Sequence, residues 1–291
     1  MYFAMDKGDV ASLANALAEQ IDASPMEWNW YALMDAGFDY NHRPLQLATA
    51  NWPLYFQPEW GELRAVSPLL IDCPRQNNAI PAKLLRHCQG RPMLGFVASV
   101  LDVETLRDIW QRSLSLTTAD GQPYILRFAD TRIAATLSQT LSPPSWRRLC
   151  APLTHWLIID RAGTLQALDL APSHLAVDEK DSWELTEPEL AGLLRSAEPD
   201  ALANRLSQDF AELLPASGAF LHHCLQRSCA ALEEHHIENA PDQLMLAVAA
   251  CLSQGRILDD PRLSQVLQSH ALQKDGLGEN LASLLDDISV L

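Results

Sequence analysis

Three charged residues stand together where a predicted strand gives way to a predicted helix. The stretch from Tyr124 to Leu137 reads YILRFADTRIAATL and contains Arg127, Asp130 and Arg132. Arginine carries a planar fork of donors that fits phosphate and carboxylate groups, so two arginines could hold an anionic ligand. An aspartate directly before a helix can instead accept a hydrogen bond from a backbone N–H of the first turn. The pattern is therefore compatible with an anion site or with a structural corner.

We favour the structural corner for this stretch. Asp130 stands at the expected N-cap, where its carboxylate can accept from the N–H of Arg132 or Ile133 and interact with the positive end of the helix. One or both arginines could then pair with Asp130 or reach a carbonyl of a neighbouring segment. A cap and an ion pair explain all three charges without a ligand.

The segment HHCLQRSCAALEEHH, residues 222–236, is the best candidate for a metal site. Histidine and cysteine are zinc ligands, but their spacing here matches no known zinc finger. On a helix, Cys224 and Cys229 share the apolar side, while His222 and His223 lean toward other faces. We expect no metal at this segment. The sequence also contains no glycine-rich phosphate loop, no HExxH, no GxSxG and no CxxC motif, which makes a common enzyme class less expected, and we assign no cofactor and no catalytic residue.

The elements that would position these residues change character along the chain. The first part alternates predicted helices with predicted strands, including 30–34, 65–72, 93–100, 123–128 and a hairpin over 155–170. Pro68 predicts that the second of these strands lies at an edge or a bulge. The later part has only helical periods, at 186–194, 199–214, 219–235, 241–254 and 261–270. We therefore predict an α+β fold, with an α/β N-terminal domain around a mixed sheet (residues 1–175) and an all-helical C-terminal domain (residues 176–291).

The net charge of −16 is unevenly distributed along the sequence. Residues 1–165 carry 14 Lys/Arg and 16 Asp/Glu, whereas residues 166–291 carry 7 and 21. This charge argues against nucleic-acid binding and against anionic membrane surfaces. The acidic second part is either a solvated helical surface or a surface suited to a basic partner.

Sequence features also indicate a cytoplasmic location. The opening MYFAMDKGDV has no basic region followed by an apolar run, as a secretory signal would. The longest apolar run, LMLAVAACL at 244–252, is less than half of the roughly 20 residues that a bilayer requires. The six cysteines have no disulfide-framework spacing, which predicts reduced, mostly buried thiols.

Four segments occur in an order that resembles the adaptor (chaperone) proteins of bacterial type VI secretion. They are WYALMDAG, PLYFQPEWGELRAVSPLLID, GFVAS and DVETLRDIWQRSLSLTTADGQPYILRFADTRI. These adaptors are similar in having an Arg-Phe-x-Asp-Pro-Arg corner, which here reads Arg127, Phe128, Ala129, Asp130, Thr131, Arg132. Thr131 replaces the proline, so we expect a slightly looser helix start. The resemblance covers residues 28–165.

The resemblance implies a cytoplasmic, non-enzymatic protein that binds a secreted effector and helps to mount it on a VgrG-type spike protein. Two alternatives remain open from the residues alone. The chain could be an enzyme in which Arg127 and Arg132 hold an anionic substrate in a cleft between the domains. It could also be an immunity or regulatory protein whose acidic helical part neutralises a basic toxin.

Overall fold

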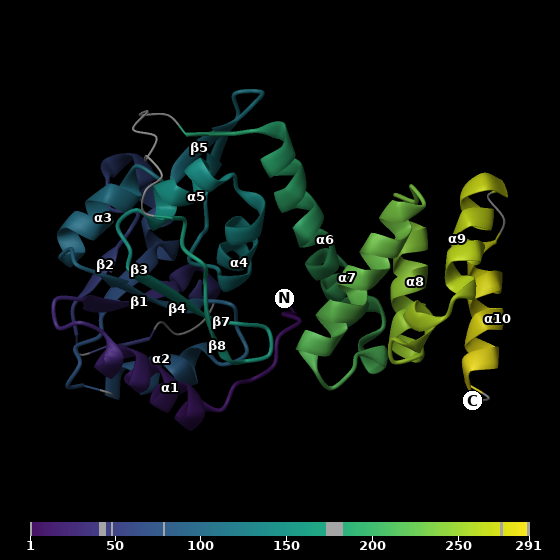
Figure 1. Ribbon diagram of the computed structural model, residues 1–291, viewed down its shortest axis with the longest axis horizontal. Coiled ribbons are helices and arrows are strands. Elements are labelled where there is room, and N and C mark those ends of the chain that lie inside the picture. The colour runs from purple at the N-terminus through teal and green to yellow at the C-terminus, as the bar shows by residue number, and fades with distance from the viewer. Residues whose placement is uncertain are drawn as a thin grey trace. The chain divides into compact units, whose positions relative to one another are not determined.

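The computed structural model describes residues 2–40, 45–47, 49–77, 79–172, 183–273 and 276–289. Contacts divide the chain into two compact units, Lys7–Leu194 and Met1–Asp6 with Arg195–Leu291. We call them the sheet unit and the helical unit (Figure 1). Sheets in the first and helices in the second confirm the predicted α+β class. The predicted boundary between residues 175 and 176 lies outside the described residues.

A six-stranded sheet forms the centre of the sheet unit. Its strand order is β2-β3-β1-β4-β7-β8, and each neighbouring pair is antiparallel. The central strands β1 and β4 are buried along nearly their whole length, which requires apolar cover on both faces. The strand bounds are β1 Asn29–Asp35, β2 Asn51–Pro53, β3 Pro68–Asp72, β4 Leu94–Ser99, β7 His155–Ile159 and β8 Leu165–Ala167.

Pro68 does not place β3 at an edge, so the edge alternative of that prediction is wrong. The strand lies between β2 and β1, with Ile71 opposite both Asn51 and Ala32. Pro68 is the first residue of β3, a position where the missing N–H interrupts little of the ladder.

The sheet unit also contains a smaller, mixed sheet of three strands. Strand β5 (Ser115–Thr118) pairs antiparallel with β6 (Pro123–Ile125) and parallel with β9 (Glu184–Leu185). Strand β6 ends before the predicted Phe128, and the N–H of Leu126 donates to the carbonyl of Leu114 instead. The segment that follows β6 is therefore free to turn toward the next helix.

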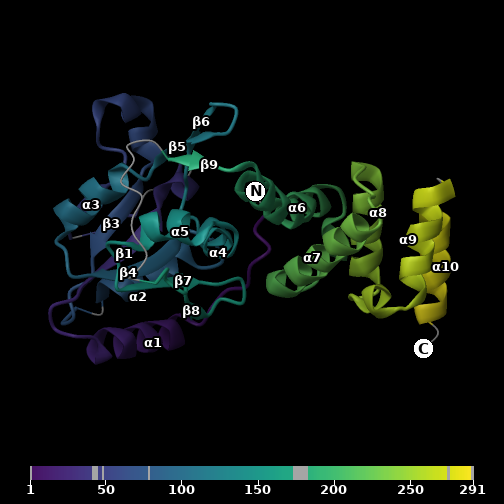
Figure 2. The same ribbon diagram turned by 45° about the horizontal axis from the view of Figure 1, so that its top comes forward.

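Helices cover both faces of the large sheet. Figures 1 and 2 show α1 (Val10–Ala23) and α2 (Ala79–Cys88) together on one face, and α3 (Val103–Gln111), α4 (Thr131–Thr140) and α5 (Pro143–Cys150) on the other. An aromatic cluster fills the second interface. Trp110 packs edge-on to Phe128 with ring centroids 5.0 Å apart, and Trp146 stacks on Trp156 at 5.4 Å. The 3-10 helices η1 (Ala36–Asp39) and η2 (Pro58–Val66) complete this unit.

The elements from residue 187 onward are helical, as predicted, but strand β9 (Glu184–Leu185) lies in the region predicted to be all-helical, and the helix bounds differ from the predicted ones. Helix α6 (Glu187–Asp209) runs without a break through Pro199, where the sequence suggested two helices. Proline removes one hydrogen bond, and buried Ala203 and Leu206 hold the part beyond it. The remaining helices are η3 (Ala211–Leu213), α7 (Gly218–Glu234), α8 (Ala240–Leu252), η4 (Arg256–Asp259), α9 (Arg262–Gln273) and α10 (Leu277–Ser289). None of the described helices is both long and apolar enough for a membrane crossing.

Candidate functional site at the strand-to-helix corner

Asp130 caps helix α4, as the sequence predicted. Its Oδ1 accepts a hydrogen bond from the backbone N–H of Arg132 at 3.0 Å, and its own backbone is extended. The neighbouring N–H of Thr131 donates to the carbonyl of Pro92, also at 3.0 Å. A proline at position 131, as in the adaptor pattern, could not donate this bond. The first turn of α4 is thus fixed both by its cap and by the segment leading into β4.

The same carboxylate forms an ion pair with Arg132. Nη2 of Arg132 lies 2.8 Å from Oδ2 of Asp130, and Nε lies 3.1 Å from Oδ1. The Asp130 side chain is 4% exposed and that of Arg132 is 17% exposed. A two-point contact between these groups is shielded from water, so it should be stronger than a surface ion pair.

Arg127 pairs with a different aspartate, Asp35, at the end of β1. Nη2 of Arg127 lies 2.7 Å from Oδ2 of Asp35, whose side chain is only 1% exposed. The other oxygen of Asp35 accepts from the N–H of Gly37 at 2.9 Å and caps η1. Asp35 is 92 positions away from Arg127 in the sequence, and our sequence analysis did not identify it as a partner. The only available signal was its place after the apolar run WYALM.

Burial and the charge of the partner have opposite effects on the pKa of each member of this pair. Burial raises the pKa of the Asp35 carboxyl, while the guanidinium of Arg127 and the N–H of Gly37 act to lower it. Burial by itself would lower the pKa of Arg127, but the Asp35 carboxylate outweighs it and raises that pKa. The Asp35 carboxylate therefore depends on Arg127 and Gly37 to remain ionised, whereas the Arg127 guanidinium is charged in either case.

Phe38 and Gly37 hold the two ion pairs close together. The guanidinium carbons of Arg127 and Arg132 lie 5.4 Å and 5.9 Å from the centroid of the Phe38 ring. A Cβ on Gly37 would come within 2.9 Å of the Asp35 carboxylate and 3.1 Å of the Arg127 guanidinium. Any side chain at position 37 would therefore push the pair apart. We call Asp35, Arg127, Asp130 and Arg132 the charged corner.

An ion pair with Arg91 and a hydrogen bond with His87 fix the other end of η1, both through Asp39. Oδ1 of Asp39 lies 2.7 Å from Nη1 of Arg91, and Oδ2 lies 2.7 Å from Nε2 of His87. Asp39 is buried, and its partners come from the end of α2 and the turn after it. The short helix between β1 and the next segment is thus anchored by a buried carboxylate at each end.

The geometry of the charged corner favours a structural role. It holds two arginines and two aspartates, so its formal charge is balanced, and each guanidinium lies against a carboxylate. An anionic ligand would have to displace a carboxylate from an arginine or approach both at once. Arg127 is the most accessible member, with half of its side chain exposed. The structural role stays a prediction, and recognition of an anion stays its alternative.

The histidine and cysteine segment lies on α7 and the turn after it. Cys224 is buried in the core of the helical unit, and Cys229 is half-buried against a second apolar cluster. Among the residues that the structure describes, no group of three or more His, Cys, Asp or Glu has an arrangement suited to a metal ion.

Comparison with known proteins gives one match. Residues 30–148 match the family model described as "Domain of unknown function (DUF4123)". This range begins in β1, contains all four residues of the charged corner and ends within α5. No curated protein matches the chain. No solved structure matches it either.

Proposed function

We propose that this protein is a cytoplasmic adaptor that binds a type VI secretion effector and helps to load it onto a VgrG-type spike protein. One observation carries the proposal. The family match at residues 30–148 falls on the stretch whose ordered motifs resemble type VI secretion adaptors, and this domain is known in adaptors associated with such effectors. In this proposal the chain works by binding proteins, without chemistry of its own.

The charged corner supports a binding scaffold over an anion-binding enzyme. Its four charges are satisfied by one another, and they join the end of β1, the segment after β6 and the start of α4. Shared contacts with Phe38 tie both pairs to η1. The residues with the most obvious chemistry therefore account for the local fold.

Loading an effector onto a spike requires two contact surfaces on one chain. A specific protein interface usually buries at least about 1,000 Å², with a few aromatic or arginine side chains contributing most of the affinity. The chain has two compact units with different compositions, which is compatible with two partners.

Co-expression of the tagged full chain with the products of its neighbouring genes tests the proposal. We expect affinity capture to retain both a toxin and a VgrG-type spike protein, each identified by mass spectrometry. Asp130→Ala should lose binding only in proportion to its loss of folded protein, measured by circular dichroism. Capture of a basic toxin without a spike protein would contradict the adaptor proposal and favour an immunity protein. A stoichiometric phosphate or nucleotide on the purified chain would favour the enzyme alternative.

A further inference from the structure

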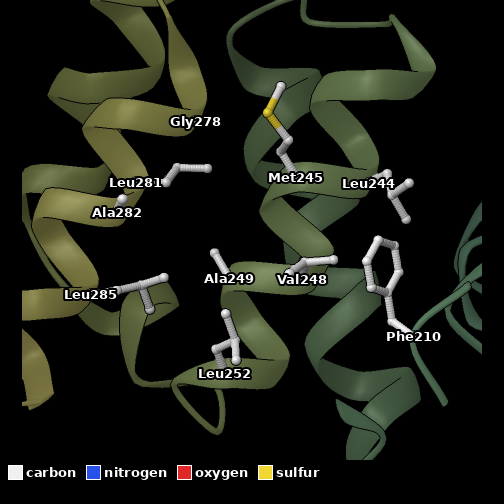
Figure 3. A pocket seen from close by; sticks show the side chains of 10 residues that line it. All are labelled: Phe210, Leu244, Met245, Val248, Ala249, Leu252, Gly278, Leu281, Ala282 and Leu285. Atoms are coloured by element: carbon white, nitrogen blue, oxygen red, sulfur yellow. The ribbon is translucent and has the colours of Figure 1, made fainter. Parts of the chain in front are cut away.

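An apolar groove opens on the helical unit between α8 and α10 (Figure 3). It has a volume of about 280 Å³ and is bordered at one end by Phe210, just after α6. Its lining contains no charged side chain. The lining residues are Phe210, Leu244, Met245, Val248, Ala249, Leu252, Gly278, Leu281, Ala282 and Leu285. We call this surface the apolar groove.

The groove exists because α8 is apolar on two sides. Within the run LMLAVAACL, Leu246 and Ala250 are fully buried in the packing of the unit. Leu244, Val248 and Leu252 recur at every fourth position, which places them along a second face, and they line the groove. Leu252 is 55% exposed. Leu244 and Val248 are partly covered, since they also pack against the apolar cluster around Leu206 and Leu221, and the part of this face toward Leu252 is left open to solvent.

Helix α10 lines the side of the groove that lies opposite α8. Ala282 faces the groove, as Figure 3 shows, while Leu281 and Leu285 lie beside it. Gly278 lets Met245 of α8 pack close to α10, since a Cβ on Gly278 would come within 3.2 Å of the Met245 sulfur. The small, exposed side chain of Ala282 leaves room for another helix, and packed helices lie about 8–10 Å apart. The groove therefore has the form that a third helix would occupy.

The outer border of the groove is acidic. Glu279 and Asp286 are exposed and lie about a quarter turn around α10 from the lining residues, on the side away from buried Leu284 and Ile288. Glu212, two positions after Phe210, is also exposed. Residues 195–291 carry 6 Lys/Arg and 14 Asp/Glu, so the surrounding surface is negative as well.

We propose that the apolar groove binds an amphipathic helix of the effector, with its apolar face in the groove and Lys or Arg along the border next to Glu279 and Asp286. That the partner is the effector rests on the proposed function. That the helix is amphipathic and basic is inferred from the apolar lining and the acidic border of the groove. A helix laid in a groove is anchored by apolar residues at spacings of three and four, which match the rows on α8 and α10. Basic flanks would relieve the repulsion among the acidic residues.

The same charges make two other occupants less suitable. A second copy of the chain would bring the same acidic border against this one, because symmetric dimers contact through the same surface. An anionic membrane would be repelled by the border for the same reason. The basic helix is the occupant for which both the apolar and the charged features are complementary.

Fluorescence anisotropy with a synthetic helix tests the chemistry of the site. The probe is a fluorescein-labelled peptide of about 18 residues, with Leu at helical spacings of three and four and Lys on both borders. Two control peptides contain the same residues in scrambled order, or Glu in place of Lys. With the full chain, we expect saturable binding of the probe and at least about tenfold weaker binding of both controls. Equal binding of the probe and the scrambled peptide would overturn the proposal.

Paired variants of exposed residues then locate the site. Leu252→Lys lies in the groove and should weaken probe binding at least about tenfold, whereas Leu272→Lys, at a leucine that is 77% exposed on α9, should not. Ala282→Trp, which fills the groove from an exposed position, should weaken binding similarly. Circular dichroism checks that each variant is folded. If Leu252→Lys and Ala282→Trp both bind the probe like the wild type, the groove is not the site.

A charge-reversed pair tests the border separately. The double variant Glu279→Lys/Asp286→Lys should bind the probe about tenfold more weakly, and its binding should depend less on salt. Glu234→Lys with Glu238→Lys makes the same change in net charge at exposed positions on and just after α7, and should have a much smaller effect. Equal losses in both double variants would mean that the attraction is non-specific and would overturn the border assignment.

Effector capture separates failure of this inference from failure of the proposed function. If the wild type captures toxin and spike protein and Leu252→Lys captures both equally well, the groove does not hold the effector and the adaptor function stands. If the wild type captures neither partner, the adaptor function fails, while the peptide measurements still decide the chemistry of the groove. A third outcome is that the wild type is a dimer, that Leu252→Lys is a monomer, and that neither binds the peptide. The occupant of the groove would then be a second copy of the chain and not an effector helix.

Discussion

Asp130 is the residue at which the structural interpretation of the corner can be tested most directly. Asp130→Ala removes the cap of α4 and the ion pair to Arg132 together. Asp130→Asn removes the charge and retains an oxygen that can accept from the N–H of Arg132, because asparagine is as good an N-cap as aspartate. Comparing the two variants therefore separates the cap from the ion pair.

The expected costs follow from the local burial. Loss of an N-cap destabilises by about 1 kcal/mol. Hydrogen bonds to charged groups contribute about 1.5–3 kcal/mol, and a value near 2 suits Arg132, which is 17% exposed and retains some access to water. We expect a cost of about 3 kcal/mol for Asp130→Ala and about 2 kcal/mol for Asp130→Asn.

Tryptophan fluorescence during urea unfolding is the appropriate measurement. All 8 tryptophans fall between Trp28 and Trp183, within the sheet unit, so the signal reports the unit that contains the corner. A probe specific to one unit also avoids treating a chain with two units as one two-state system. A double-mutant cycle with Arg132→Met should give a coupling energy of about 1–2 kcal/mol.

Two results would refute this reasoning. If Asp130→Ala unfolds at the same urea concentration as the wild type and has lost its partners, the corner is a recognition site. If Asp130→Asn is as stable as the wild type and Asp130→Ala shows no coupling to Arg132→Met, the ion pair contributes nothing and the cap accounts for the whole effect of Asp130→Ala.

Three further predictions concern other buried groups. Arg127→Met should cost more stability than Asp35→Asn, about 3 against about 1.5 kcal/mol, because it leaves a carboxylate buried without its cation. Since burial raises the pKa of Asp35, its folded state binds the proton more tightly, and the deficit of Arg127→Met should shrink in urea titrations as pH is lowered from about 7 to about 5. Burial alone would raise the pKa of Glu189, but hydrogen bonds from Ser142 and Thr186 lower it. Glu189→Gln should therefore cost about 1–2 kcal/mol at neutral pH, and the difference from the wild type should begin to shrink as pH falls through the unfolded pKa of about 4.3 and disappear only below the lowered pKa of the folded state. Burial raises the pKa of the Cys73 thiol to about 12, so iodoacetamide at about pH 8 should label it only after unfolding, as judged by peptide mass spectrometry.

Local signals in the sequence were sufficient to predict the ends of several elements. Asp102 caps α3 and Asp130 caps α4, because an N-cap depends only on a side chain and the next few backbone groups. Glu189 accepts from the N–H of Thr186 at 3.0 Å, the contact that the Thr-x-x-Glu spacing of a capping box allows. Gly163, with φ of +73°, occupies the turn between β7 and β8. Each of these depends on neighbours in sequence.

Contacts between distant segments could not be predicted in the same way. Sequence analysis offered Asp130 as a partner for either arginine, but Arg127 lies against Asp35 instead. That choice depends on where β1 ends relative to the segment after β6, which no local pattern determines. The error at Pro68 has a similar origin. The position of β3 within the sheet depends on β2, a strand of three residues with almost no signal in the sequence.

The arginines of the two units are used differently, and this bears on which surface can attract a partner. In the sheet unit, the arginines of the corner neutralise carboxylates that burial would otherwise destabilise. In the helical unit, Arg195, Arg205, Arg227 and Arg262 each pair with Asp or Glu at the surface.

These surface pairs leave most of the acidic residues of the helical unit uncompensated, since residues 195–291 contain 14 of them against 6 Lys/Arg. Surface ion pairs add little stability, so the arrangement acts mainly through the field that it produces around the unit. A negative field accelerates the approach of a basic segment, and an apolar groove within that field supplies the affinity that charge alone does not. The two contributions can be separated, because added salt should slow association with the helical unit and leave dissociation from the groove nearly unchanged.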